Sequence, residues 1–304
     1  MDKSAITLER MRSFVRVAER GSFSAVAREY GVGQATVTRH ITELESALGV
    51  TLLSRTTRRV TLTAEGTDYL ENARIIMRLV DEAADDARSA GDRLAGKIRV
   101  SCTAALGVRH VQEALFAFQD QHPDVSIDLR LSDVRIDLVR EAVDIAIRLG
   151  PLADSSMQRK AIGNSRRVLV ASKAYLEEHG RPQKPDDLLH HWKIRMSNVG
   201  GSDMLVLHPQ EGQPCSTPFD GRLLLDHGLA AREALLQGRG IASAHIWLVD
   251  DLLEAGTVEW VLPDYAPEPV ALSILIVPGR ARIKRIRSLI DTLSGALKAL
   301  PGIG

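Results

Sequence analysis

Residues 21–48 read GSFSAVAREYGVGQATVTRHITELESAL, and they decide the fold of the amino-terminal part of the chain. Ser22 can cap a short helix over residues 23–30, and a tight glycine turn at residues 31–33 follows it. Apolar residues at helical spacing then predict a further helix, which Gly49 ends. Two short helices that meet at a glycine turn indicate a helix-turn-helix.

The outer face of the helix after the turn suits the major groove of duplex DNA. Its side chains are small, hydroxylic and singly basic, and Gln34 stands in the first turn, where a recognition helix usually meets bases. A solvated face in an ordinary helical bundle is the alternative interpretation. The candidate DNA-binding residues on the two helices are Ser22, Gln34, Ala35, Thr36, Thr38, Arg39 and Thr42.

A short arginine-rich hairpin is predicted next. Residues 51–53 and 59–62 are typical of β-strands, and the segment between them holds three arginines in five residues without an acidic residue. A hairpin beside a helix-turn-helix is a wing, whose arginines would meet phosphates or the minor groove. We therefore add Arg55, Arg58 and Arg59 to the candidate DNA-binding residues.

A long helix is predicted to follow the wing. Thr63 can cap it, and Glu65 favours its positive end. Apolar residues at strict three-four spacing over three heptads predict a coiled-coil contact between two chains, with a helix lying on its own domain as the alternative. The predicted seam is formed by Leu70, Ala73, Met77, Val80, Ala84 and Ala87.

The charge distribution separates the chain into three parts. The 304 residues carry 39 Lys/Arg and 39 Asp/Glu, so the whole chain is neutral. Residues 1–62 hold ten basic and six acidic residues, residues 63–95 hold four and eight, and the remainder is balanced. A local basic patch can still bind a polyanion, because salt screens charges beyond about 10 Å.

Composition excludes several classes of protein. Two cysteines are too few for a disulfide scaffold or a four-cysteine zinc site. The chain has no uncharged apolar run of about 18 residues, and its first 19 residues lack the pattern of a signal peptide. We therefore expect a soluble, cytoplasmic protein.

Strands and helices alternate from residue 96 onward. Their order predicts an α/β fold with mainly parallel sheets and two lobes joined by two crossings, which leaves a cleft at the carboxyl ends of the strands. The predicted strands are 98–102, 125–131, 143–147, 167–171, 194–196, 223–225, one that begins at 241, and 270–277, and the predicted helices are 108–119, 134–142, 229–237 and a last helix striped by apolar residues from 283 to 297.

These stretches together resemble the LysR-type transcriptional regulators. The similar segments of the amino-terminal part are residues 14–27 (FVRVAERGSFSAVA), 32–41 (VGQATVTRHI), 44–50 (LESALGV), 52–56 (LLSRT) and 62–66 (LTAEG). Two further segments are residues 143–151 (VDIAIRLGP) and 238–242 (GRGIA). Gly33 stands where the family usually has Ser, and Ala35 where it often has Pro, so a serine hydroxyl contact to phosphate would be missing.

The resemblance implies a three-part organisation. A winged helix-turn-helix DNA-binding domain would occupy residues 1–62, a linker and dimerisation helix residues 63–95, and an effector-binding domain similar to periplasmic solute-binding proteins residues 96–304. Lobe I would comprise residues 96–165 and 268–304, and lobe II residues 166–267. The expected partners are double-stranded DNA, a small-molecule effector and further copies of the chain, as a dimer through the linker helix and a tetramer; neither a cofactor nor a membrane is expected.

Candidate effector-binding residues follow strands or begin helices, where free N–H groups favour a small anionic or polar ligand. They are Thr103, Ala104, Ala105, Arg148, Ser197, Asn198, Asp226 and His227. Each has a plainer interpretation. Thr103 and Asp226 can be helix caps only, Arg148 can pair with a surface acid, and His227 can be a solvated loop residue.

Catalysis is not expected, because the sequence has no nucleophile elbow, P-loop or HExxH motif. Cys102 lies in a predicted strand and is interpreted as a core residue, and the adjacent His190 and His191 would point apart rather than share a metal. A second hypothesis is a solute-binding protein whose amino-terminal head makes an interaction other than DNA binding. The arginine-rich wing and the missing signal sequence disfavour it.

Overall fold

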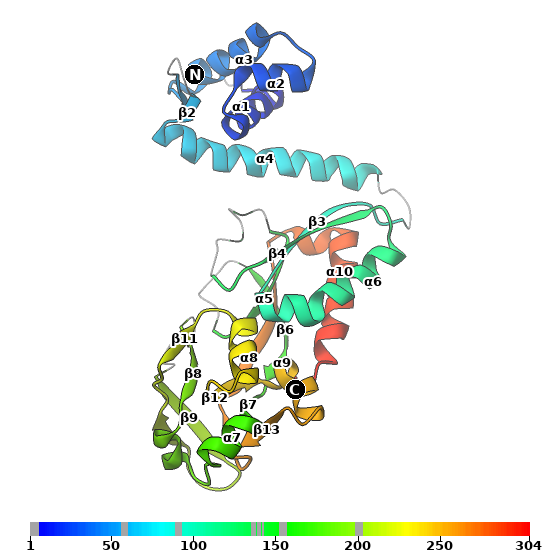
Figure 1. Cartoon of the computed structure of the whole chain (residues 1–304). Helices are drawn as coiled ribbons and strands as arrows, with labels where there is room; N and C mark the ends of the chain where they lie inside the picture. Colours follow the sequence, from blue (N-terminus) through cyan, green and yellow to red (C-terminus); the bar gives the residue numbers. More distant parts are fainter. Residues whose placement is uncertain are drawn as a thin grey trace. The chain divides into compact units, whose positions relative to one another are not determined.

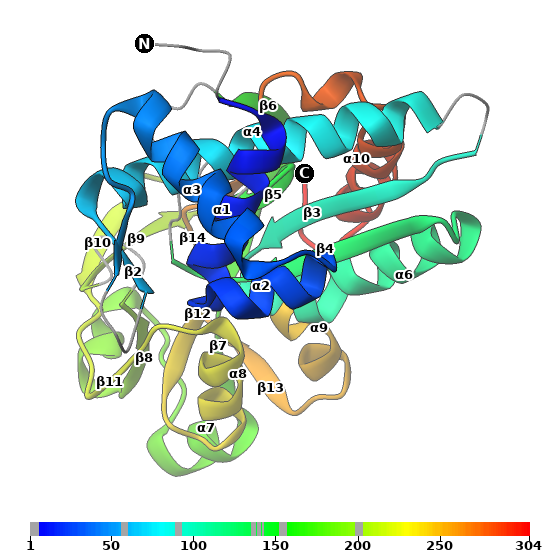
Figure 2. The same cartoon turned by 90° about the horizontal axis from the view of Figure 1, so that it is seen from above.

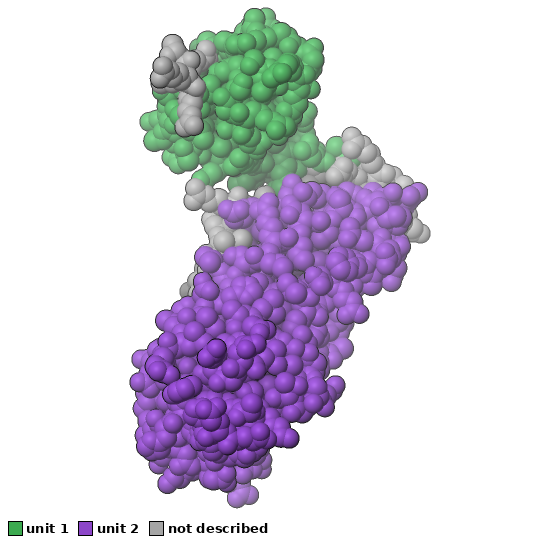
Figure 3. Space-filling model, viewed as in Figure 1, with its two compact units in different colours: residues 1–92 green, residues 93–304 purple. Residues whose placement is uncertain are grey.

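The computed structural model describes residues 6–55, 60–88, 93–134, 138, 141, 143–151, 157–197 and 203–304. The chain divides into two compact units, residues 1–92 and residues 93–304 (Figure 3). Most of the helix predicted over residues 134–142 lies outside the described residues. No helix of the described part is long and apolar enough to cross a membrane.

The first unit is a three-helix head with a hairpin and a long helix (Figure 1). Thr7 and Ser22 cap the first two helices, because their hydroxyls accept the backbone N–H groups of Arg10 and Ala25 at 3.3 and 3.2 Å. Gly31 adopts a left-handed φ of 66° and makes the turn. The elements are α1 (Leu8–Arg20), α2 (Phe23–Tyr30), α3 (Gln34–Leu48), β1 (Leu53–Arg55), β2 (Val60–Leu62) and α4 (Ala64–Arg88).

The long helix α4 lies along its own head, which corrects part of the predicted seam. Leu70, Ala73 and Met77 are buried in the core that α1 to α3 build around Phe14. They are therefore covered by the same chain and do not face a partner. The neighbouring stripe of α4 carries the exposed apolar side chains of this helix, Ile76 and Leu79.

The second unit contains two five-stranded sheets, and we call the part built on each one lobe I and lobe II. In lobe I the strand order is β4-β3-β5-β15-β6. Figure 2 shows β3 and β4 side by side with α6 along them. Its elements are β3 (Gly96–Cys102), α5 (Ala104–Leu106), the π-helical turn η2 (Gly107–Val111), α6 (Gln112–Gln121), β4 (Val125–Leu131), β5 (Ile145–Leu149), β6 (Gln158–Ser165), β15 (Val270–Ile276), η4 (Arg280–Arg282) and α10 (Lys284–Lys298).

Lobe II pairs its sheet, in the order β11-β8-β12-β7-β13, with a small three-stranded sheet, β10-β9-β14. Its elements are β7 (Arg167–Ser172), α7 (Lys173–His179), η3 (Pro185–His190), β8 (Lys193–Met196), β9 (Met204–Pro209), β10 (Cys215–Pro218), β11 (Leu223–Leu225), α8 (Gly228–Leu236), β12 (Ile241–His245), α9 (Ile246–Glu254), β13 (Val258–Val261) and β14 (Tyr265–Pro267).

In each large sheet four strands run in the same direction, as predicted for a mainly parallel sheet, and one strand is reversed. In lobe I, β3 runs parallel to β4 and β5, but β15 runs antiparallel to β5 and β6. In lobe II, β8 runs parallel to β11 and β12, whereas β7 is antiparallel to β12 and β13. The cause is the two crossings, which send the chain from β6 into β7 and from β14 into β15, so that each lobe receives strands from the other in the reversed direction.

The lobes share one apolar core. Trp247 at the start of α9 donates a hydrogen bond to Ser165 at the first crossing (2.9 Å), and His110 of lobe I contacts the carbonyl oxygen of Trp247 at 2.8 Å. Arg109 pairs with Asp251 of α9 at 3.0 Å. These contacts join the two lobes through polar side chains as well as through the apolar core.

Candidate nucleic-acid interface and interlobe cleft

Helix α3 separates a buried face from an exposed one. Val37, Ile41 and Leu44 are fully buried against α1 and α2, so the opposite face must point outward. Gln34, Ala35, Arg39 and Thr42 are exposed, and Thr36 and Thr38 are half-buried beside them. The predicted DNA-facing residues of α3 therefore lie together on one accessible surface.

Arg39 is the accessible cation of this surface. Its side chain is 66% exposed, and its one ion pair among the described residues is a 4.0 Å contact with Glu43 one turn away. A contact of that length at the surface is worth little, so the guanidinium is free to bind a phosphate or a base edge.

The start of α3 carries no side-chain cap, because Gly33 occupies the cap position. The preceding helix differs, since the Ser22 hydroxyl is used as its cap and also lies 3.1 Å from the Ser24 hydroxyl. The Ser22 hydroxyl could therefore donate to a phosphate only while it also accepts the N–H of Ala25. The unpartnered N–H groups at the start of α3 remain available to an anion.

Glu45, in the last turn of α3, holds the wing and was not anticipated from the sequence. Its Oε1 accepts the backbone N–H groups of Leu52 and Leu53 at 2.8 and 3.0 Å. The hairpin then pairs Leu53 with Leu62 and Arg55 with Val60. Arg58 and Arg59 lie outside the described residues, as does the side chain of Arg55.

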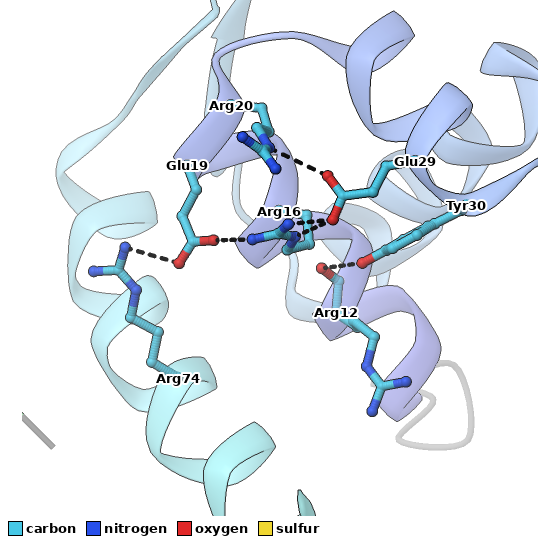
Figure 4. Close-up of polar contacts among 7 residues, drawn as sticks. All are labelled: Arg12, Arg16, Glu19, Arg20, Glu29, Tyr30 and Arg74. Atoms are coloured by element: carbon cyan, nitrogen blue, oxygen red, sulfur yellow. Dashed lines mark hydrogen bonds and ion pairs between the residues drawn. The ribbon is translucent and has the colours of Figure 1, made fainter. Parts of the chain in front are cut away.

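Most other arginines of the head are held in ion pairs (Figure 4). Arg16 donates to Glu19 at 2.9 Å and also to Glu29, and this contact lowers the pKa of the Glu29 carboxyl. Arg20 also binds Glu29, and Arg74 of α4 binds Glu19 at 3.2 Å. The network ties α1 to α2 and α4, so these cations orient helices and are not DNA-facing candidates.

In the second unit, the first strand of lobe I ends just before the predicted effector residue Thr103. Thr103 occupies the cap position of α5, but its hydroxyl makes no cap hydrogen bond and is buried without a hydrogen-bond partner in the described part of the chain. Ala104 donates its N–H to Asp133 Oδ1 at 3.0 Å, so that group is not free for a ligand as predicted. Ala105 is buried and meets the start of α8 at Gly228.

Arg148 is a half-buried cation near the carboxyl end of β5. It donates to the Ser101 hydroxyl at 2.7 Å and to the carbonyl oxygen of Ile147 at 3.0 Å. Partial burial lowers its pKa, whereas the nearby Asp133 carboxylate acts in the opposite direction. Within the described residues no carboxylate lies at ion-pair distance from its guanidinium, and Asp133 is the acid that attracts it. Cys102 lies between these groups, and complete burial raises the pKa of its thiol to about 12, which keeps it neutral.

Asp133 of lobe I and His227 of lobe II meet across the boundary between the lobes. His227 Nε2 lies 4.0 Å from Asp133 Oδ2, an oxygen that is buried without a hydrogen-bond partner among the described residues. His227, and not Asp226, is the residue at the cap position of α8. Asp133 was missed, although it follows strand β4, whose carboxyl end lies beside that of β3; the rule that selected Thr103 would have found it.

The structure thus gathers some predicted effector residues and not others. Thr103, Arg148 and His227 converge around Asp133. Asp226 is exposed, and Ser197 donates its hydroxyl to the carbonyl oxygen of Leu225 at 3.3 Å. Asn198 lies outside the described residues. Within the ranges that the structure describes, no group of three His, Cys, Asp or Glu residues is placed to hold a metal ion.

Comparison with known proteins matches two family models. Residues 8–67 match the bacterial regulatory helix-turn-helix protein of the lysR family, and residues 91–298 match the LysR substrate binding domain. The chain is 32% identical to the HTH-type transcriptional regulator DmlR of Escherichia coli over 94% of this chain and 93% of that protein. It is 30% identical to the probable regulator LtrA of Klebsiella pneumoniae, with 94% of both chains covered.

Solved structures show the same architecture. The full-length Vibrio cholerae virulence activator AphB aligns with a TM-score of 0.64 and 26% identity over 95% of this chain and 99% of that chain. CrgA, a LysR-type transcriptional regulator from Neisseria meningitidis, aligns with a TM-score of 0.62 and 28% identity over 95% and 98% of the two chains. The predicted fold, a helix-turn-helix head followed by an α/β regulatory domain, is therefore confirmed.

Proposed function

Because this chain belongs to the LysR family of helix-turn-helix transcriptional regulators, we propose that α3 and the wing read a specific operator and that a small polar anion in the interlobe cleft modulates this binding. The exposed face of α3, with the accessible guanidinium of Arg39, carries the DNA-binding part of the proposal. Two such heads in a dimer would meet two half-sites of an interrupted palindrome. We propose that dimers associate further into tetramers.

Replacement of Arg39 tests the DNA-binding face. Arg39→Ala should weaken operator binding by about tenfold or more, because a charge-assisted contact to a base or phosphate is lost. Fluorescence anisotropy with operator DNA at several salt concentrations measures this effect. If the contact is to phosphate, the salt dependence should also become shallower.

Arg181→Ala is the matched control, since it also removes one exposed arginine. Arg181 pairs with Glu259 in lobe II and belongs to the second unit. Unchanged operator affinity in Arg39→Ala, or an equal loss in Arg181→Ala, would contradict the assignment of this face.

The groups in the cleft define the effector that it would take. Arg148 offers a guanidinium whose nearby acid, Asp133, is not at ion-pair distance, and Thr103 offers a buried hydroxyl. Asp133 Oδ2 lacks a hydrogen-bond donor, so the ligand should bring one beside its anionic group. A hydroxy acid or an amino acid of small size has this combination.

Ligand binding would regulate the protein only if it favours one arrangement of the lobes. Thr103, Asp133 and Arg148 belong to lobe I, whereas His227 belongs to lobe II. Because His227 Nε2 already lies 4.0 Å from Asp133 Oδ2, a ligand inserted between the two side chains would favour an arrangement in which the lobes are further apart. A ligand that contacts lobe I alone would bind without changing the equilibrium.

Calorimetry with a panel of small hydroxy and amino carboxylates tests the cleft. Arg148→Ala should lower the affinity of any carboxylate that binds there by at least about tenfold, because the charge-assisted contact is lost. Arg130→Ala is the control, since Arg130 pairs with Glu141 on the surface of the same lobe. An affinity that survives in Arg148→Ala would remove Arg148 from the site.

A further inference from the structure

Glu43 of α3 lies between two arginines of the head. Its Oε2 is 2.5 Å from the Nη2 of Arg10 in the first turn of α1, whereas its Oε1 is 4.0 Å from the Nε of Arg39. A carboxylate therefore stands beside the guanidinium that we propose to contact DNA, but a different arginine holds it.

The packing of α1 against α3 brings Arg10 to this carboxylate. Ser13 of α1 is fully buried, and its hydroxyl forms a 2.8 Å hydrogen bond with Nδ1 of His40 on α3. Arg10 stands one turn before Ser13 and Glu43 one turn after His40, so their ion pair continues the same contact between the helices. Glu9 also approaches His40, with 3.7 Å between its Oε1 and Nε2 of the ring. The ion pair thus belongs to a defined helix interface.

Three physical effects favour the pairing of Glu43 with Arg10 over its pairing with Arg39. The Arg10 side chain is 23% exposed and that of Arg39 is 66% exposed, so water screens the contact with Arg10 less. Within α3 the arginine precedes the glutamate, which is the weaker order for a pair four residues apart. Arg10 also stands at the positive end of the α1 dipole, where a carboxylate is favoured.

Loss of Arg10 would release Glu43 toward Arg39. The two side chains are one turn apart on α3, a spacing at which opposite charges pair. A guanidinium that is paired in this way must give up the carboxylate before it can bind a phosphate or a base edge. The carboxylate, no longer neutralised by Arg10, would also repel phosphates. Both effects would lower the affinity for DNA.

We propose that Arg10 is a positioning residue of the DNA-binding surface, and that it acts by holding Glu43 away from Arg39. The inference rests on the proposed function of α3, because it concerns the availability of Arg39 to DNA. It extends that function to α1, which lies outside the two helices of the helix-turn-helix.

Substitutions of Arg10 in the full chain test the proposal. The probe is a DNA duplex that the wild-type protein selects from a random-sequence pool, and fluorescence anisotropy measures its binding. Arg10→Met removes the charge but keeps a long side chain, and it should lower the affinity about threefold to tenfold. Arg10→Lys keeps a cation that can pair with Glu43, and its affinity should stay within about twofold of the wild type.

A double substitution separates positioning from direct contact. In Glu43→Gln no carboxylate can compete for Arg39, so Arg10 has nothing left to hold. The combination of Arg10→Met with Glu43→Gln should therefore bind the duplex within about twofold of Glu43→Gln alone. A purely structural role of Arg10 would not be rescued in this way.

Arg12→Met is the matched control for the loss of one cation near a polyanion. Arg12 lies on the same helix, but it pairs with Asp81 of α4 at 3.5 Å and not with α3. Its substitution should change the affinity by less than about twofold. Thermal unfolding followed by circular dichroism should give the same midpoint for Arg10→Met and Arg12→Met, which excludes a folding defect as the cause of the difference.

Three results would overturn the role of Arg10. These are wild-type affinity in Arg10→Met, an equal loss in Arg12→Met, and an equal loss from Arg10→Met whether residue 43 is Glu or Gln, which would indicate that Arg10 contacts DNA itself. If Arg39→Ala loses affinity while the double variant is not rescued, the proposed DNA-binding face stands and only the role of Arg10 fails. If Arg39→Ala binds as the wild type does, both fail.

Discussion

Gly66, in the first turn of α4, is the residue at which the head least tolerates a side chain. A Cβ atom there would overlap the carbonyl oxygen of Leu52, which also accepts the N–H of Thr63 at 3.0 Å. Gly66→Ala should therefore destabilise the head by about 1–3 kcal/mol, because backbone rather than a flexible side chain must move. Chemical denaturation followed by circular dichroism measures this loss.

Gly295 provides the matched control, since it is also a helical glycine. A Cβ atom at Gly295, in α10, meets nothing within 4 Å. Gly295→Ala should leave stability unchanged or raise it by up to about 1 kcal/mol, because alanine favours helix. Equal changes in stability for the two substitutions would show that the approach of the Leu52 carbonyl oxygen to Gly66 does not determine the cost of a side chain at residue 66.

At the same scale, local signals were predictable and distant partners were not. Ser22 as a cap, and Gly33 as a cap without a side chain, could be predicted because a cap depends on the next three residues. Glu45 and Asp133 were missed, because their backbone partners are seven and 29 residues away in sequence. Such pairings follow from the tertiary approach of elements, which periodicity does not encode.

At the scale of elements, α4 presents one apolar stripe to its own head and another to solvent. Leu79 is 53% exposed, and Ile76 is 39% exposed on the same stripe. We propose that these side chains form the contact between two chains. Leu79→Ser should weaken self-association at least about tenfold, measured by analytical ultracentrifugation, because the buried apolar area is lost.

Leu189→Ser controls for the loss of an exposed leucine. Leu189 is also 53% exposed but lies in η3 of lobe II. The Leu189→Ser substitution should not change the dissociation constant of the dimer, measured at low protein concentration. Dimers of wild-type affinity in Leu79→Ser would place the interface elsewhere.

Helices and strands were predicted well where apolar residues recur at a regular spacing. The helix over residues 23–30 has the expected bounds, since Ser22 caps its start and Gly31 ends it. Strand β6 was missed because its sequence, QRKAIGNS, is polar and lies at a sheet edge. Helix α9 was also missed, although its polar residues Asp250, Asp251 and Glu254 share one face and its apolar residues join the core common to both lobes.

At the scale of the whole molecule, separate cores imply separate unfolding. Phe14 is buried in the core of the first unit, and Phe118 in the shared core of the two lobes. Differential scanning calorimetry of the full chain should therefore show two transitions. Phe14→Ala should lower the midpoint temperature of the transition of the first unit, and Phe118→Ala that of the second unit. Each substitution should reduce the unfolding free energy of its unit by about 3–5 kcal/mol. One transition that both variants shift equally would contradict this independence.

The carboxylate of Glu45 has a consequence for the spacing of the operator contacts that the head would accept. Because it clamps the entry of the hairpin to the end of α3, the two parts that we propose to contact DNA cannot slide independently of one another. A base pair inserted between their footprints would be rejected rather than accommodated. The width of the minor groove beneath the hairpin would then influence which bases α3 accepts. The affinity of the head for an operator would therefore depend jointly on the groove width at the hairpin and on the base sequence at α3.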